Sequence, residues 1–373
     1  MKSTVRNTSF LYFALLCIFF SVNSSPINPA YILGGGLILI LFFHMLTHMK
    51  MQKFTLITIL FSVSSLILQL IGMRMMPFYP EGPNYLTPVL FSYSILISTC
   101  VIESFKGISF KSRTVIYENI FNLAIFFLFI ELITRIINYN SANVGFYSLK
   151  YSVLYFDSNF TGLVILALCS FSWYLKNFQG KDFKIQRRLL YLLLLVTFSR
   201  GAIAALIITR IGLANKNKIK MRSYIMITCA ALIFGIMAYE YISKSESYVG
   251  FDGSFNSKFY IISKALSFYY TQSSLVHFFG IGLGNSSQFI GIFAHNIYVT
   301  LVLEMGIAGT ILFLMYISYT VKLSNGHVMY VWIPVFIGGI SLFSAFSPFI
   351  FIVTSLICCE SDSDRGKKIE KHT

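Results

Sequence analysis

Three groups of residues in the second half of the sequence combine side chains that can bind an anion or accept a proton. They are Ser199-Arg200-Gly201, the turn that contains Gly280, Gly282 and Gly284, and His295-Asn296 followed by Glu304 and Gly306. An arginine guanidinium holds a phosphate or carboxylate through two parallel hydrogen bonds. A neutral imidazole can accept a proton from a hydroxyl near neutral pH. These residue types can therefore hold an anion and deprotonate a hydroxyl.

His295 and Glu304 also have structural interpretations. His295 can instead cap or anchor a helix that begins beside it. Glu304 lies nine residues later, and in a helix this spacing turns it by about 900°, half a turn away from the face of His295. Direct pairing of the two side chains is therefore disfavoured, and we expect Glu304 to brace a neighbouring helix rather than to take part in catalysis.

The glycine-rich turn has the spacing of a dinucleotide-binding loop but not its surroundings. An aromatic stretch typical of a helix precedes it, and no strand-helix-strand unit surrounds it. The dinucleotide motif needs that unit to place the phosphates at a helix N-terminus. Close packing or a flexible backbone before His295 is therefore the better interpretation of these glycines.

The composition indicates an integral membrane protein. Of the 373 residues, 56% are hydrophobic and 12% are charged, whereas a soluble domain has about 25% charged residues. The net charge of +15 comes from basic residues grouped between apolar runs. This is the positive-inside pattern of membrane proteins and not a nucleic-acid-binding face. We therefore expect membrane lipids, and no nucleic acid, around the chain.

Apolar runs predict an all-α, polytopic membrane bundle of about twelve transmembrane helices in a single domain, residues 1–373. The expected spans are 10–22, 30–47, 54–73, 85–102, 118–137, 158–175, 188–199, 201–214, 222–241, 296–319, 328–344 and 346–359. The basic groups between them place both termini in the cytoplasm. Residues 242–295 then form a large outer loop, with a surface helix near residues 255–269, and residues 360–373 form a polar cytoplasmic tail.

The segment 189–214 can be one long helix or a hairpin of two short ones. A single helix would hold Arg200 near the middle of the bilayer, at a cost of about 2.5–3.5 kcal/mol, and would move the later basic groups to the outer side. A hairpin avoids both problems. Each arm would be only about 20 Å long, so we expect its tip at Ser199-Arg200-Gly201 to be recessed below the outer surface.

The remaining polar residues have simpler interpretations. All six cysteines lie in apolar segments without metal-ligand spacing, which predicts buried thiols and neither a disulfide framework nor a metal site. Four further cations are expected on the outer side as interfacial anchors. They are Arg74, Arg135, Lys150 and Lys264.

Two stretches of the sequence resemble the bacterial O-antigen polymerase and O-antigen ligase superfamily. They are TFSRGAIAALI (197–207) and GIGLGNSSQFIGIFAHNIYVTLVLEMGIAGTILFL (280–314). The family pattern is a serine-arginine-glycine helix pair, a large periplasmic loop, and a G-x-G turn that leads into histidine-asparagine and an E-x-G-x-x-G span. The resemblance covers about residues 190–315, and before that only the hydropathy agrees.

The resemblance implies a glycosyltransferase of GT-C-like architecture in the bacterial inner membrane. Such an enzyme transfers a glycan from undecaprenyl diphosphate to a sugar hydroxyl at the periplasmic face, with inversion and without cofactor or metal. A chain-length regulator and a flippase are implied as partners.

The same resemblance implies roles for individual residues. Arg200 and Lys258 would bind the diphosphate together with Asn296, and His295 would act on the acceptor hydroxyl. Gly282, Gly284, Glu304 and Gly306 would support the site. The family commonly has an arginine where this sequence has Lys258, and a lysine supplies the charge without the planar fork.

Three functions fit these features. A polymerase joins one lipid-linked repeat unit to another, and a ligase transfers the finished chain to lipid A core; both share the motifs. We favour the polymerase because of the twelve expected spans with both ends inside. A flippase or transporter is the alternative from another class, but the two halves show no repeat.

Overall fold

The structure is a computed structural model that describes residues 29–48, 51–105, 108–139, 149, 151–152, 156–214, 253–340 and 348–370. Within these ranges the chain is all-α, as predicted, apart from two short strands. The strands are β1 (Tyr151–Ser152) and β2 (Phe156–Asp157), which pair antiparallel with Tyr151 opposite Asp157. The helical elements are α2 (Pro29–His48), α3 (Lys53–Met75), α4 (Leu86–Phe105), α5 (Phe110–Ile137), α6 (Ser158–Gln179), α7 (Lys184–Val196), α8 (Arg200–Ala214), α10 (Gly253–Tyr270), α11 (Ser274–Phe279), α12 (Ser286–Ile290), α13 (Ile297–Val299), the π-helix η2 (Thr300–Glu304), α14 (Gly306–Leu323), α15 (Met329–Gly338) and α16 (Phe349–Glu370).

Five helices in the described part are long and apolar enough to cross a membrane: α3, α4, most of α5, α6 and α14. On α3, apolar side chains such as Leu56, Leu60 and Ile67 are exposed at helical spacing, which gives the helix an apolar outer face. A water-soluble protein rarely exposes a long contiguous apolar surface. Long apolar helices with such outer faces are characteristic of a membrane protein.

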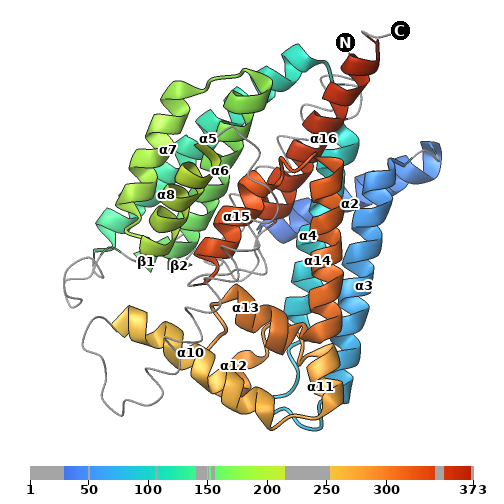
Figure 1. Cartoon of the computed structure of the whole chain (residues 1–373), viewed down its shortest axis with the longest axis vertical. Helices are drawn as coiled ribbons and strands as arrows, with labels where there is room; N and C mark the ends of the chain where they lie inside the picture. Colours follow the sequence, from blue (N-terminus) through green and yellow to red (C-terminus); the bar gives the residue numbers. More distant parts are fainter. Residues whose placement is uncertain are drawn as a thin grey trace.

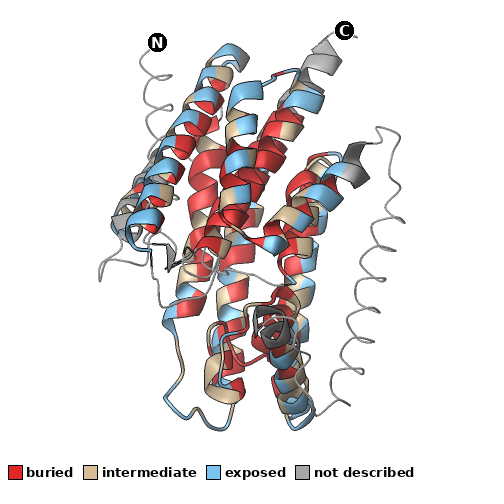
Figure 2. Ribbon diagram, turned by 90° about the vertical axis from the view of Figure 1, so that its left-hand side faces the viewer, coloured by how far each residue is buried: buried red, intermediate tan, exposed pale blue. Residues whose placement is uncertain are grey.

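The central helix of the bundle is α6. In its most apolar segment 83% of the residues are buried, against 33% in that of α14. Small residues let its neighbours approach closely: a Cβ at Gly162 would lie 2.8 Å from the Cβ of Ser199 and 3.2 Å from that of Ala202 in α8. Figure 2 shows buried residues along the facing sides of the long helices and exposed residues on their outer sides.

A second, smaller hydrophobic core holds the elements around the glycine-rich turn. It includes Ile261 of α10, Ile281 in the turn, Ile290 of α12 and Leu303 of η2. Figure 1 shows α10 to α13 in its lower half, whereas the α6–α7 turn and the C-terminal part of α16 lie in the upper half. The described part of the predicted outer loop is therefore packed structure, and α10 contains the helix predicted at residues 255–269.

The predicted hairpin within residues 189–214 is confirmed as two helices. Helix α7 ends at Val196 and α8 begins at Arg200, and both pack against α6. We call the connection, residues 197–199, the elbow. A continuous helix is excluded because Phe198 has a positive φ of 54°, which an α-helix does not contain.

The single span predicted at residues 296–319 is wrong. The chain passes through α13 and η2, and the membrane-length helix α14 begins only at Gly306, whose φ is +67°. Other boundaries also differ, since α5 begins at Phe110 and not at residue 118, and α15 ends at Gly338. The predicted spans 10–22 and 222–241 lie outside the described residues, and the total of twelve stays a prediction.

Candidate functional site

The glycine-rich turn packs directly against the segment that carries Glu304. The backbone N–H of Ile281 donates to the carbonyl of Leu303 (3.1 Å), and that of Gly282 donates to the carbonyl of Glu304 (2.9 Å). Gly280, Gly282 and Gly284 all have φ near +78°, a conformation that side-chain-bearing residues rarely adopt. A Cβ at Gly280 would overlap the backbone of Glu304. Close packing, one of the two expected roles of these glycines, is therefore what they provide.

The same turn is held by α3 and by the segment before α4. The Leu283 N–H donates to Oε1 of Gln69 (3.1 Å), and Oδ1 of Asn285 accepts from the N–H of Asn84 (2.8 Å). A Cβ at Gly282 would meet Met73, and one at Gly284 would meet Thr87. Gly282 and Gly284 thus support the site by allowing the turn to fit against these helices.

Glu304 is buried and braces the first residue of α12. Its Oε1 accepts a hydrogen bond from the backbone N–H of Ser286 (3.1 Å). Burial raises the pKa of the Glu304 carboxyl above its usual value, although hydrogen bonds from Ser286 and Gly284 oppose that shift. This contact matches the bracing role that its spacing from His295 suggested.

Asn296 fixes the backbone that follows His295. Its Oδ1 accepts from the N–H groups of Tyr298 (2.9 Å) and Val299 (3.2 Å), and its Nδ2 donates to the carbonyl of Ile340 (2.7 Å). Asn296 is therefore the N-cap of α13 and also ties this segment to the end of α15. The contact of Asn296 with a diphosphate stays a prediction.

His295 lies in the segment before α13 and is partly exposed. The helix cap is Asn296, so the alternative in which His295 caps the helix is wrong. Its ring centroid lies 6.1 Å from that of Phe160 in α6 and 6.2 Å from that of Phe293. Two aromatic rings therefore lie near the imidazole, and one of them belongs to α6.

Arg200 is the first residue of α8 and is exposed, whereas Thr197 and Ser199 in the elbow are buried. The elbow contains the strained residue Phe198, with φ of +54°. Strain of this kind persists only where the surrounding structure enforces it, and it is frequent at functional sites. Arg200 thus leaves a fixed turn with an exposed side chain at a helix N-terminus.

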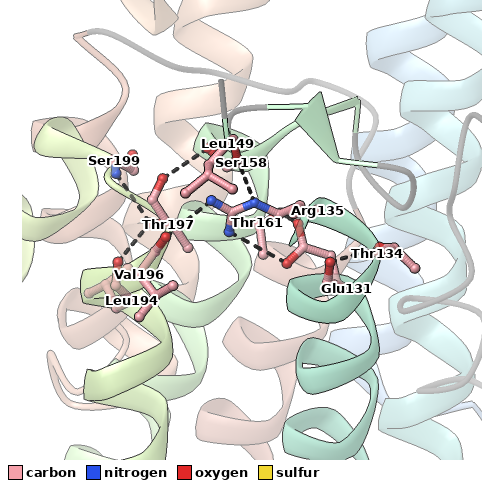
Figure 3. A network of polar contacts seen from close by, with 10 residues as sticks. All are labelled: Glu131, Thr134, Arg135, Leu149, Ser158, Thr161, Leu194, Val196, Thr197 and Ser199. Carbon is pink, nitrogen blue, oxygen red and sulfur yellow. Dashed lines mark hydrogen bonds and ion pairs between the residues drawn. The ribbon is translucent and has the colours of Figure 1, made fainter. Parts of the chain in front are cut away.

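A buried polar network holds the elbow, and Arg135 is at its centre (Figure 3). Its Nε donates to the carbonyl of Leu149 (2.9 Å), its Nη2 donates to the carbonyl of Val196 (3.1 Å), and its Nη1 lies 3.7 Å from a carboxylate oxygen of Glu131. The Thr161 hydroxyl donates to the other carboxylate oxygen (3.1 Å). Arg135 is only 2% exposed, so its predicted role as an interfacial anchor is wrong.

A sequence signal for this network exists. Glu131 and Arg135 stand four residues apart, on one face of a helix, inside an apolar span. Ionisable residues within a span usually face the bundle interior and pair with each other or with backbone carbonyls. The other expected anchors Arg74 and Lys264 are exposed, and Lys150 lies outside the described residues.

The first turn of α6 connects the two main candidates. The Ser158 hydroxyl donates to the carbonyl of Thr197 in the elbow (2.9 Å), and the ring of Phe160 lies beside His295. The elbow therefore contacts Ser158 and the ring of His295 lies near Phe160, and both residues belong to the first turn of α6. Lys258 lies in α10, in the lower half of Figure 1, and its side chain is outside what the structure describes.

Within the described residues, no group of three His, Cys, Asp or Glu side chains is placed to hold a metal ion. Compared with known proteins, the chain matches no protein-family model and no curated protein.

Proposed function

We propose that this chain is a membrane-embedded glycosyltransferase with the activity of an O-antigen polymerase. It transfers a growing glycan from undecaprenyl diphosphate to a sugar hydroxyl of another lipid-linked repeat unit. The observation that carries the proposal is the connection of the Arg200 elbow and His295 through the first turn of α6. In this proposal the first turn of α6 supports both an anion-binding residue and a proton acceptor.

Arg200 is suited to the leaving group. It is an exposed guanidinium at the N-terminus of α8, where the helix dipole also favours negative charge. As the sugar-phosphate bond breaks, charge develops on the diphosphate, and a fixed cation stabilises it. In this proposal Lys258 of α10 supplies a second positive charge.

His295 is suited to the acceptor. The acceptor oxygen attacks the anomeric carbon, the bond from that carbon to the phosphate oxygen breaks, and undecaprenyl diphosphate leaves with the electron pair. The proton of the attacking hydroxyl passes to the imidazole. One displacement of this kind inverts the anomeric configuration, and it uses the cations of the chain in place of a metal ion.

The topology belongs to the same proposal. The chain would cross the bacterial inner membrane about twelve times in a GT-C-like arrangement, with both termini in the cytoplasm and Arg200 and His295 at the periplasmic face. A flippase would deliver the lipid-linked repeat unit, and a chain-length regulator would act on the growing polymer. The large helical loop that precedes His295 supports extracytoplasmic chemistry over transport.

The proposal is tested by Arg200→Ala and His295→Ala in a strain that lacks the chromosomal gene. Both variants should reach the membrane and lose chain extension by on the order of 10²-fold or more, the usual effect of removing an acid-base or charge-stabilising group. Arg188→Ala and His277→Gln are matched controls. Arg188 is exposed near the start of α7, away from the elbow, and His277 of α11 is hydrogen-bonded to the carbonyl of Tyr269 in α10.

The readout is the length distribution of surface polysaccharide. Long chains from both the Arg200 and the His295 variants would refute the site. The strain without the gene separates the two enzymes of the superfamily, since a single repeat on lipid A core marks a missing polymerase. If no repeats are attached, the chain is a ligase.

A further inference from the structure

Arg135 is buried beneath the elbow and contacts three separate parts of the chain. We propose that Arg135 is a positioning residue whose guanidinium fixes the elbow and thereby the direction of Arg200. The inference rests on the function proposed for Arg200. Because Arg135 is 2% exposed, it acts through the backbone and does not itself bind a substrate.

The elbow leaves backbone carbonyls that no helix can satisfy. The last carbonyls of a helix have no partner within it, and inside a membrane protein water rarely replaces one. Thr197 and Phe198 donate back to the carbonyls of Leu194 and Leu195, but the next carbonyls, of Val196 and Thr197, need other donors. Arg135 supplies the first and Ser158 supplies the second.

The Arg135 guanidinium contacts two backbone carbonyls more closely than it contacts the carboxylate of Glu131. Its bonds to Leu149 (2.9 Å) and Val196 (3.1 Å) are within hydrogen-bond range, whereas its closest approach to Glu131 is 3.7 Å. Glu131 therefore mainly neutralises the buried charge, and Thr161 holds that carboxylate in place. The donors of Arg135 hold the carbonyl at the end of α7 and that of Leu149 before β1, as Figure 3 shows.

The elbow has little room to adopt another shape. Ser199 is fully buried and lies close to α6. A Cβ added at Gly162 of α6 would lie 2.8 Å from the Cβ of Ser199. Phe198 already occupies a strained backbone conformation. Arg200 follows directly, so a shift of the Val196 carbonyl turns the start of α8 and moves the Arg200 side chain.

The first test replaces the ion pair without leaving a buried charge. In Glu131→Leu/Arg135→Met both charges become apolar side chains of similar size, a change that folded proteins usually tolerate. We expect normal membrane levels, and turnover that falls by on the order of tenfold or more because misplacing a catalytic group is costly. The half-saturating concentration of purified lipid-linked repeat units should change by less than about twofold.

Two further variants make this test specific. Arg113→Met/Glu360→Leu makes the same change in another buried pair, at the opposite end of α5, and should retain turnover. Arg135→Lys keeps the charge but not the fork that reaches both carbonyls, so its turnover should fall between those of the wild type and the double variant. Wild-type turnover in both Glu131→Leu/Arg135→Met and Arg135→Lys would overturn the proposal.

The second test does not depend on activity. The six native cysteines are replaced by alanine, and the thiol introduced by Arg200→Cys is labelled from outside with a membrane-impermeant maleimide. Adding Glu131→Leu/Arg135→Met should change the labelling rate severalfold, whereas adding Arg113→Met/Glu360→Leu should not. An unchanged rate in the first case would overturn the positioning role. If the rate changes but Arg200→Ala still makes long chains, the positioning role stands and the proposed enzyme function fails.

Discussion

Helix α5 carries a buried arginine-carboxylate pair near each end, and the two pairs are built differently. Near its start, Nε of Arg113 lies 3.0 Å from the carboxylate of Glu360 in α16. Near its end, Arg135 approaches Glu131 only to 3.7 Å and donates instead to two backbone carbonyls. The first pair joins side chains of two helices, and the second holds the carbonyl at the end of α7 and that of Leu149 before β1.

This difference separates stability from positioning. Glu360 also accepts a hydrogen bond from Tyr117, and the Lys181 ammonium lies 5.3 Å from the centre of the Tyr117 ring. The Arg113 pair therefore attaches α16 to the bundle, and Glu360 and Ser361 are buried parts of α16 although they begin the predicted polar tail. We expect changes there to alter unfolding, and changes around Arg135 to alter turnover as well.

The largest expected effect comes from removing one charge of the Arg113 pair. Arg113→Ala leaves the carboxylate of Glu360 buried, and such changes cost roughly 3–5 kcal/mol. Thermal unfolding of the purified protein in detergent should show a clear loss of stability. The fraction that remains folded should keep normal turnover. A loss below about 1 kcal/mol would mean that the pair does not attach α16.

A smaller effect is expected from removing one hydrogen bond to each carboxylate. Tyr117→Phe and Thr161→Val each remove a donor to a charged group, which contributes about 1.5–3 kcal/mol. Both variants should unfold at lower temperature, but only Thr161→Val should reduce the turnover of lipid-linked repeat units. Equal turnover losses in the two variants would contradict the separation of roles.

The smallest effect is expected from a pair in which only the carboxylate is exposed, formed by Asp182 in the turn between α6 and α7 and Arg187 in α7. Arg187 lies 2.7 Å from Asp182, and a hydrogen bond from Arg187 lowers the pKa of the Asp182 carboxyl. The stabilisation is therefore present above the pKa of an unfolded aspartate, about 3.9, and is lost as the pH falls through the lower folded value. Because Asp182 is 42% exposed, Asp182→Asn should cost well under about 1 kcal/mol.

The measurement for Asp182 is thermal unfolding at neutral pH in low and high salt. Salt screens an exposed pair but not a buried one, so the difference between wild type and Asp182→Asn should shrink in high salt. The Arg113→Ala difference should persist. If the difference in unfolding between wild type and Asp182→Asn persisted in high salt, the Arg187–Asp182 pair would behave like the buried Arg113–Glu360 pair.

The sequence predicted the elements whose signal is local. Apolar runs located α3, α4 and α6 because each helix is long and uninterrupted. The interruption at Ser199-Arg200-Gly201 predicted the elbow, because an arginine is costly in the middle of a span. The positive φ of Phe198 is the backbone conformation that breaks the helix there.

The parts that the sequence did not predict depend on distant residues. Hydropathy alone cannot place the start of α14 at Gly306, because the break depends on the backbone of Gly280, which a Cβ at Gly306 would overlap. Arg135 was expected to be an anchor because a cation at the end of a span usually is one. Its burial depends on carbonyls 14 and 61 residues away.

The late start of α14 determines how far His295 stands from the lipid tails. Its 18 residues measure about 27 Å, close to the roughly 30 Å of hydrocarbon in a bilayer. If α14 crosses the hydrocarbon, Gly306 lies at the membrane boundary, and the periplasmic placement proposed for His295 would put the imidazole near the same boundary. In the proposed reaction a sugar would meet the imidazole there without shedding its hydration shell, while its lipid anchor stays among the acyl chains.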